Sequence, residues 1–181
     1  QPARNHDAAF LAVMRQRHAP LMEAYSAFFE AGDAMDAALE ANEDQRRKEQ
    51  IAAIEKEEGR SAAFYHLSII GEGKQLVKVL DGDAPDLAAG RAQLARYQSV
   101  LEEAAKAKIG QGDPMWGHME RSADKLASEG GRRIERLQAN QPLSRSDQIL
   151  LESGGMPPSG TAPALLASYN DLVDMSNRMA R

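Results

Sequence analysis

The sequence predicts an all-α protein, an antiparallel four- to five-helix bundle with heptad-type packing. The first observation is a seven-residue apolar repeat near the start of the chain, whose positions follow one another at alternating steps of three and four. These positions form one narrow stripe on an α-helix, and they are Leu11, Met14, His18, Leu21, Tyr25, Phe28, Gly32, Met35 and Leu39. We expect other helices of the same chain to cover the stripe, so Phe28→Ala should destabilise the fold by roughly 3–5 kcal/mol.

The composition is the second observation, and it favours helices over strands. Alanine, the best helix former, is abundant, whereas the Val, Ile and Thr residues that favour strands are sparse. Hydrophobic residues make up 43% of the chain and aromatic residues only 5%. A chain of 181 residues is long enough to bury a core within one domain.

Charge and residue usage exclude several classes of protein. The net charge of −5 argues against nucleic-acid binding, which needs a dominant basic surface. The absence of cysteine excludes disulfides, thiol catalysis and cysteine-ligated metals. No apolar run approaches the roughly 18 residues of a membrane span, so the sequence predicts no membrane-spanning helix.

The start of the chain bears on export and on domain organisation. Gln1 stands where an initiator Met would be expected, which fits either removal of an export signal or trimming of the chain. We expect residues 1–7 to form a flexible N-terminal tether and residues 8–181 to form a single helical-bundle domain. In the export interpretation, the membrane contact is a lipid anchor upstream of Gln1.

The first two helices are expected over about 20–41 and 43–80. Pro20 suits the first position of a helix, so residues 8–18 should form a separate turn or a kinked extension. Within the second helix, dense alternation of charge predicts a solvated first part up to Arg60. The apolar residues from Ala62 onward predict a buried second part.

The remaining helices follow from turn and cap signals. Residues 81–85 form a turn, after which a helix should run from Leu87 to just before Gly110. Asp113 and Pro114 suit the cap and first position of the next helix. The stripe of that helix is Trp116, Met119, Ala123, Leu126, Gly130, Ile134 and Leu137.

The C-terminal part contains the longest irregular stretch and the closing helix. Residues 140–163 are rich in glycine and proline, and we expect one short helix at 144–152. The closing helix is predicted from the spacing of Leu165, Tyr169, Leu172, Ser176 and Met179.

The sequence shows no constellation typical of catalysis or metal binding. The four histidines, His6, His18, His66 and His118, include no pair at the three- or four-residue spacing that places two ligands on one helical face. His18 and His66 are expected to be buried or boundary residues. No phosphate-binding loop, serine elbow or HExxH motif occurs. We therefore predict a protein that is not an enzyme and that has no cofactor or metal.

A basic cluster lies on the predicted fourth helix and alternates with acidic residues. We expect a solvated face with helical ion pairs, and a protein-contact face is the alternative. The cations are Arg121, Lys125, Arg132, Arg133 and Arg136.

Near the C-terminus, residues 169–177, Tyr-Asn-Asp-Leu-Val-Asp-Met-Ser-Asn, resemble the closing segment of the YiiG-like exported bacterial lipoproteins, a family of unknown function. The early segment 25–29 and the long charged second helix are similar in kind. The resemblance implies an all-helical, exported protein with a processed N-terminus and no assigned enzymatic activity. Some exported members of such families look like immunity proteins, so the resemblance also implies that role.

The function predicted from the sequence is therefore that of a non-catalytic periplasmic helical bundle that binds a protein. The partner would be a secreted toxin or effector, which the bundle would neutralise as an immunity protein or inhibitor. The predicted contact residues are Glu55, Glu57 and Glu58, together with loop 140–163. Two alternatives stay open: a bundle that binds a metal or small ligand through His66 or His118, and a structural coiled-coil adaptor.

Overall fold

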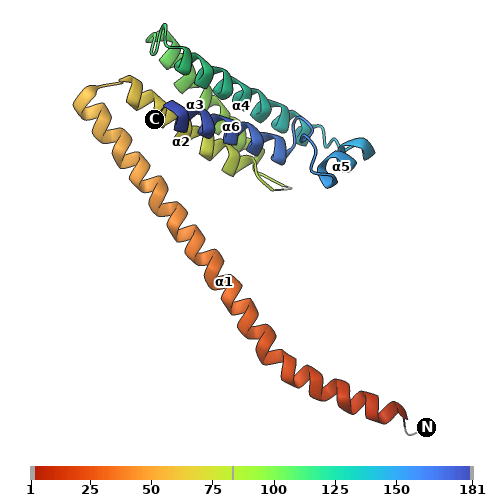
Figure 1. Cartoon of the computed structure of the whole chain (residues 1–181). Helices are drawn as coiled ribbons and strands as arrows, with labels where there is room; N and C mark the ends of the chain where they lie inside the picture. Colours follow the sequence, from red (N-terminus) through yellow and green to blue (C-terminus); the bar gives the residue numbers. More distant parts are fainter. Residues whose placement is uncertain (1–2, 83, 180–181) are drawn as a thin grey trace. The chain divides into compact units, whose positions relative to one another are not determined.

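The computed structural model describes residues 3–82 and 84–179, with side chains described at 13, at 16 and from 18 onward. Within these ranges there are helices and no strand, which confirms the all-α prediction. Residue contacts divide the chain into two units, Gln1–Arg46 and Arg47–Arg181. The helices, labelled in Figure 1, are α1 (Ala3–Glu58), α2 (Ala62–Leu80), α3 (Leu87–Lys106), α4 (Pro114–Gln138), α5 (Arg145–Glu152) and α6 (Ala162–Met179).

Helix α1 is longer than the sequence signals suggested. It begins at Ala3 and passes through Pro20 without interruption, so the predicted helix start at Pro20 is wrong. The predicted break between 41 and 43 is also wrong, because the chain is helical throughout this stretch. An internal proline removes one backbone donor and crowds the preceding turn, but here the helix continues beyond it.

The turn between α1 and α2 falls inside the region predicted as one helix over 43–80. Gly59 has a φ of 71°, a left-handed conformation that glycine adopts without a Cβ clash and that commonly ends helices. Ser61 then caps α2, since its hydroxyl accepts a hydrogen bond from the backbone N–H of Phe64. Gly59 and Ser61 therefore separate the charged end of α1 from α2, which has a buried apolar face.

Four helices of the second unit, α2, α3, α4 and α6, form an antiparallel bundle in which consecutive helices are neighbours and α6 returns to α2. Figure 1 shows these four helices side by side. The pairing of α2 with α3 illustrates their opposite directions. Gln93 near the start of α3 bonds to Glu72 in α2, whereas Glu103 near the end of α3 pairs with Arg60, just before α2. The bundle prediction is therefore confirmed.

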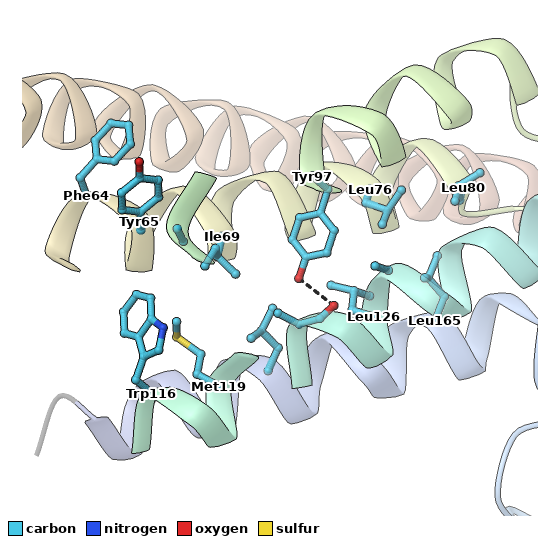
Figure 2. Packing of buried hydrophobic residues seen from close by; sticks show 14 of the residues in the cluster. Phe64, Tyr65, Ile69, Leu76, Leu80, Tyr97, Trp116, Met119, Leu126 and Leu165 are labelled. Atoms are coloured by element: carbon cyan, nitrogen blue, oxygen red, sulfur yellow. Dashed lines mark hydrogen bonds between the residues drawn. The ribbon is translucent and has the colours of Figure 1, made fainter. Parts of the chain in front are cut away.

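The core of this bundle is formed by large side chains from all four helices (Figure 2). Tyr97 is fully buried, and its hydroxyl donates a hydrogen bond to the carbonyl oxygen of Ala123 at 3.3 Å. Burial raises the pKa of Tyr97 well above its ordinary value. The last turns of α1 also belong to the second unit, and their Ile51 and Ile54 pack against the core. The fully buried apolar residues include Ile69, Leu76, Leu80, Tyr97, Met119, Leu126 and Leu172.

The first stripe behaves differently from the later ones. Phe28, expected in the core, is 74% exposed, and His18, expected at a buried or boundary position, is exposed as well. Within the first unit, which contains no helix besides α1 in its described residues, nothing covers this stripe, so the expected burial against neighbouring helices is not met there. The side chains of Leu11 and Met14 lie outside the described residues. By contrast, the stripe of α4 is buried from Trp116 to Ile134, as predicted.

The predicted tether of residues 1–7 and single domain of residues 8–181 stay predictions. Residues 1 and 2 lie outside the described part of the chain, and α1 begins at Ala3. The division by contacts falls between Arg46 and Arg47. Among the described residues, no helix combines the length and the apolar character that crossing a membrane requires.

Candidate interaction surface

The most prominent surface feature is an apolar stripe on α1, formed by Leu21, Tyr25, Phe28, Gly32, Met35 and Leu39. Residues at these steps of three and four lie above one another on one helical face. Each of the five large side chains is more than half exposed. Met22 and Phe29, at 64% and 57% exposed, widen the stripe on one side.

The aromatic rings of this apolar stripe form a contiguous cluster. The ring centroids of Tyr25 and Phe29 are 5.5 Å apart, and those of Phe28 and Phe29 are 5.9 Å apart in an edge-to-face arrangement. Such distances are typical of favourable aromatic pairs. The rings therefore support one another on the helix surface, although no other helix of the first unit covers them.

The two flanks of the apolar stripe differ in charge and size. Residues 19–45 contain seven acidic side chains and no Lys, Arg or His. Asp33 and Asp36 are exposed and lie next to stripe positions Gly32 and Met35. The opposite flank, one position before Tyr25, Gly32 and Leu39 in the heptad, is all alanine, namely Ala24, Ala31 and Ala38. The face is thus acidic on one flank and allows close approach on the other.

Gly32 interrupts the row of large side chains. It follows Phe28 by four residues and precedes Met35 by three, so it lies one turn from each on the same face. A Cβ added at Gly32 would meet no heavy atom within 4 Å. The apolar stripe therefore has a notch at Gly32 between two exposed large side chains.

The contact residues predicted from the sequence, Glu55, Glu57 and Glu58, lie in the last turn of α1 and are exposed. Two of them make contacts within the chain. Glu55 accepts a hydrogen bond from Arg60 at 3.0 Å, and Glu58 accepts one from the hydroxyl of Ser61 at 3.1 Å. The hydrogen bond that Arg60 donates to Glu55 and the charge of Glu103 raise the pKa of Arg60. These contacts brace the turn between α1 and α2, and a role in partner binding stays a prediction.

The other predicted contact region, loop 140–163, lies at one end of the second unit beside a cavity of about 660 Å³. Its predicted short helix is confirmed as α5. Two arginines of α4 hold the surrounding segments. Arg133 donates to the carbonyl oxygens of Leu80 and Gly82, and Arg136 donates to that of Pro142 and pairs with Asp147. The basic cluster thus includes structural contacts, beyond the ion pairs along one helix that the sequence predicted.

Glu129 makes a further anchor between α4 and the segment before α6. Its carboxylate accepts hydrogen bonds from the Ser159 hydroxyl at 3.0 and 3.1 Å and from the Gly160 backbone N–H at 2.9 Å. Arg132 pairs with the same group at 2.8 Å. Burial alone would raise the pKa of Glu129, but these hydrogen bonds and the Arg132 charge together lower it.

The histidines of the second unit lie on different helices, His66 on α2 and His118 on α4. His66 is half-buried and bonds to the Ser176 hydroxyl at 2.7 Å, and burial lowers the pKa of His66. His118 bonds to Arg121 at 2.9 Å and lines a 360 Å³ cavity between α4 and α6. The described residues contain no group of three or more His, Asp or Glu that could hold a metal. The ligand-binding alternative stays a prediction.

Comparisons with known proteins place the chain in a family. The family described as "Protein of unknown function (DUF3829)" matches residues 7–178. The chain belongs to this family. Its relative in Escherichia coli (strain K12), described as an uncharacterized protein, YiiG, is 23% identical over 164 residues. These residues are 90% of this chain and 46% of YiiG, so the chain spans about half the length of that relative. No solved structure matches.

The family assignment confirms the predicted resemblance to YiiG-like proteins of unknown function. The leading functional interpretation of the sequence assigned these side chains to the core, and only its coiled-coil adaptor alternative left part of the apolar stripe as a contact surface. The signal that could have identified the surface is the charge distribution. A stretch with seven acids and no cation resembles neither the mixed-charge α4 nor the mixed-charge end of α1.

Proposed function

We propose that this member of the DUF3829 family is a non-catalytic, exported protein-binding protein that acts as an immunity protein or inhibitor of an antibacterial toxin. The observation that carries the proposal is the exposed apolar stripe of α1. Soluble proteins rarely expose contiguous apolar patches of this kind, and such patches mark interaction sites. Five large side chains are exposed along one face of α1, and the ring of Phe29 lies against the rings of Tyr25 and Phe28. This arrangement fits protein recognition.

The second unit supports the proposal as a stable scaffold. Its core is closed by four helices, and its connecting segments are fixed by contacts such as those of Glu129 and Arg136. A surface of the second unit that is held in one conformation, such as the predicted contact region 140–163, loses little entropy on binding. Inhibition of a toxin by tight association requires such a surface and no chemistry of its own.

The exported location and the toxin partner rest on the resemblance of residues 169–177 to YiiG-like lipoproteins. The acidic character of residues 19–45 adds a physical reason, because it suits a basic partner and speeds electrostatic association. Both parts are tested together. The full chain, affinity-tagged and expressed in its own cells, should be recovered from the periplasmic fraction with one protein in stoichiometric amount.

Production of the recovered partner alone should then arrest growth of a host strain, and co-production of the chain should restore growth. A partner that is harmless when produced alone would reject the inhibitor role and leave protein binding. Recovery of the chain alone from every fraction would reject the proposal.

A further inference from the structure

We infer that the apolar stripe of α1 binds a basic amphipathic helix of a partner protein, which places a bulky apolar side chain at Gly32 and Lys or Arg side chains beside Asp33 and Asp36. This inference rests on the proposed function, since it names the chemistry of the partner. It also moves the contact away from Glu55, Glu57 and Glu58.

The size of the apolar stripe suits one partner helix. From Leu21 to Leu39 there are 18 steps along the sequence, which at about 1.5 Å per residue span roughly 27 Å, or five turns. Seven large apolar side chains on this face are more than half exposed. If each of these side chains has roughly 150–250 Å² of surface and somewhat more than half of it is exposed, covering the face would bury about 600–1,000 Å². That area is close to the roughly 800 Å² per partner of a stable interface.

Anchors at steps of three and four are the pattern by which an amphipathic helix lies along another apolar surface. The alanine flank, Ala24, Ala31 and Ala38, allows the partner backbone to approach closely on one side. Gly32 breaks the row of large side chains and leaves a site for one large residue of the partner. A helix that inserts such a residue would fill the notch at Gly32 and leave no void in the interface. Voids cost stability at interfaces as they do in cores.

Charge selects the class of partner. Residues 19–45 carry seven acidic side chains and no cation. A membrane surface with anionic lipids attracts basic segments and would repel this one. A partner with Lys or Arg beside its apolar face would instead gain from Asp33 and Asp36, which are exposed at the edge of the stripe.

A second copy of this chain, paired in parallel and in register, fits less well for two reasons. Two parallel copies would bring their acidic segments together with no compensating cation in that stretch. They would also place Gly32 opposite Gly32, leaving a layer with no side chain at the centre of the interface. Heptad interfaces gain their stability from knobs that fill holes, so a different partner sequence is favoured.

The test uses two synthetic helical peptides as probes. Both have Leu at the a and d positions of four heptads, and one has Lys whereas the other has Glu at the e and g positions. Binding of each labelled peptide to the full chain is measured by fluorescence anisotropy at several salt concentrations. We expect the Lys peptide to bind at least tenfold more tightly than the Glu peptide, with an affinity that falls as salt rises.

Variants of the full chain locate the contact. Phe28→Ala and Gly32→Leu should each weaken binding of the Lys peptide at least fivefold. The double variant Asp33→Lys, Asp36→Lys should weaken it at least tenfold and flatten the salt dependence.

Matched controls change the same chemistry elsewhere. Leu166→Ala removes an exposed apolar side chain of α6, 48% exposed, and Glu57→Lys with Glu102→Lys reverses two exposed charges outside the stripe. Both controls should leave the affinity within twofold. Equal binding of the two peptides, or equal losses in the stripe and control variants, would overturn the inference.

Other occupants of the apolar stripe give distinct results. A dimer in sedimentation velocity that Phe28→Ala dissociates would assign the stripe to a second copy. Slow hydrogen exchange over residues 21–39 in the free monomer would assign it to another part of this chain, and binding to phosphatidylglycerol vesicles would assign it to a membrane. Each of these results would overturn the inference.

The inference and the proposed function fail separately. If the Phe28→Ala variant still recovers the stoichiometric partner from cells, the proposed function stands and the apolar stripe is rejected as the binding site. Tight, salt-dependent binding of the Lys peptide without any partner in cells would reject the proposed function and preserve the recognition chemistry of the stripe.

Discussion

Glu129 joins α4 to the segment before α6 through its carboxylate. The Ser159 hydroxyl, the Gly160 backbone N–H and the Arg132 guanidinium hold its carboxylate, which is only 10% exposed. Hydrogen bonds to a charged group contribute about 1.5–3 kcal/mol. We expect Glu129→Gln to lower the free energy of unfolding by about that amount at pH 7, as measured by urea denaturation.

The pH dependence of this loss follows from the lowered pKa of Glu129. A carboxyl group with a lower pKa in the folded than in the unfolded state stabilises the fold above its ordinary pKa, here 4.5, and loses that contribution as the pH falls through the folded value. The difference between Glu129→Gln and the original chain should therefore shrink below about pH 4.5. The control is Glu102→Gln, which changes an exposed pair with Lys106 and should cost less than about 0.5 kcal/mol. If Glu129→Gln lowered the free energy of unfolding equally at all pH values, the shape of the Glu129 side chain rather than its charge would be responsible for the loss.

Two glycines in helix interiors should respond in opposite ways to the same substitution. A Cβ at Gly90 would lie 2.5 Å from Leu80 Cδ2, and Leu80 is fully buried. A Cβ at Gly131 would meet nothing within 4 Å. We expect Gly90→Ala to destabilise the fold by about 1–2 kcal/mol through overpacking, and Gly131→Ala to stabilise it by about 0.5–1 kcal/mol through helix propensity. Thermal melting of both variants measures the difference, and changes of equal sign would contradict the close approach at Gly90.

At the scale of elements, α1 and α4 carry similar apolar stripes but bury them to different extents. Phe28 of α1 is 74% exposed, whereas Leu126 of α4 is fully buried. We expect Phe28→Ala to change the free energy of unfolding by less than about 1 kcal/mol, and Leu126→Ala to lower it by about 2–5 kcal/mol. Guanidinium denaturation compares the two. A loss above about 3 kcal/mol for Phe28→Ala would mean that the stripe is buried in the folded chain after all.

The same contrast shows how far the sequence predicts this structure. Local chemistry located most helix ends correctly. Asp113 caps α4 at Pro114, and Asp86 caps α3 by accepting hydrogen bonds from the first backbone N–H groups. Ser144 caps α5, which begins at Arg145, one residue after the predicted start. Such ends depend on neighbouring residues alone, so their signals are visible in the chain.

The errors occur where the outcome depends on more than neighbouring residues. Pro20 was interpreted as a helix start, but α1 extends on both sides of it, from Ala3 to Glu58. Gly59 and Ser61 carried the correct signals for a helix end and a cap, and the charge pattern around them obscured these signals. Periodicity at Phe28 showed that a face needs a partner, but periodicity does not show whether the partner belongs to the same chain.

At the scale of the whole molecule, the core of the fold lies within one of the two units. Every buried or partly buried residue of the hydrophobic cluster falls between Ile51 and Met179. The seven acids and the apolar stripe of α1 lie before Arg46. If the apolar stripe binds a partner as proposed, stability and recognition belong to different parts of the chain, and the recognition surface can vary without loss of the fold.

This separation predicts the behaviour of a shortened chain. Residues 47–181 contain every member of the hydrophobic cluster, the last turns of α1 included. We expect this fragment to unfold cooperatively, with a melting midpoint within about 3 °C of the full chain, because a shift of that size corresponds to less than about 1 kcal/mol in a domain of this length. Scanning calorimetry of both proteins measures the midpoints, and the Lys peptide supplies the second readout. The fragment should keep its fold and lose all binding of the peptide, whereas a fragment that melts without cooperativity would place part of the folding energy in residues 1–46.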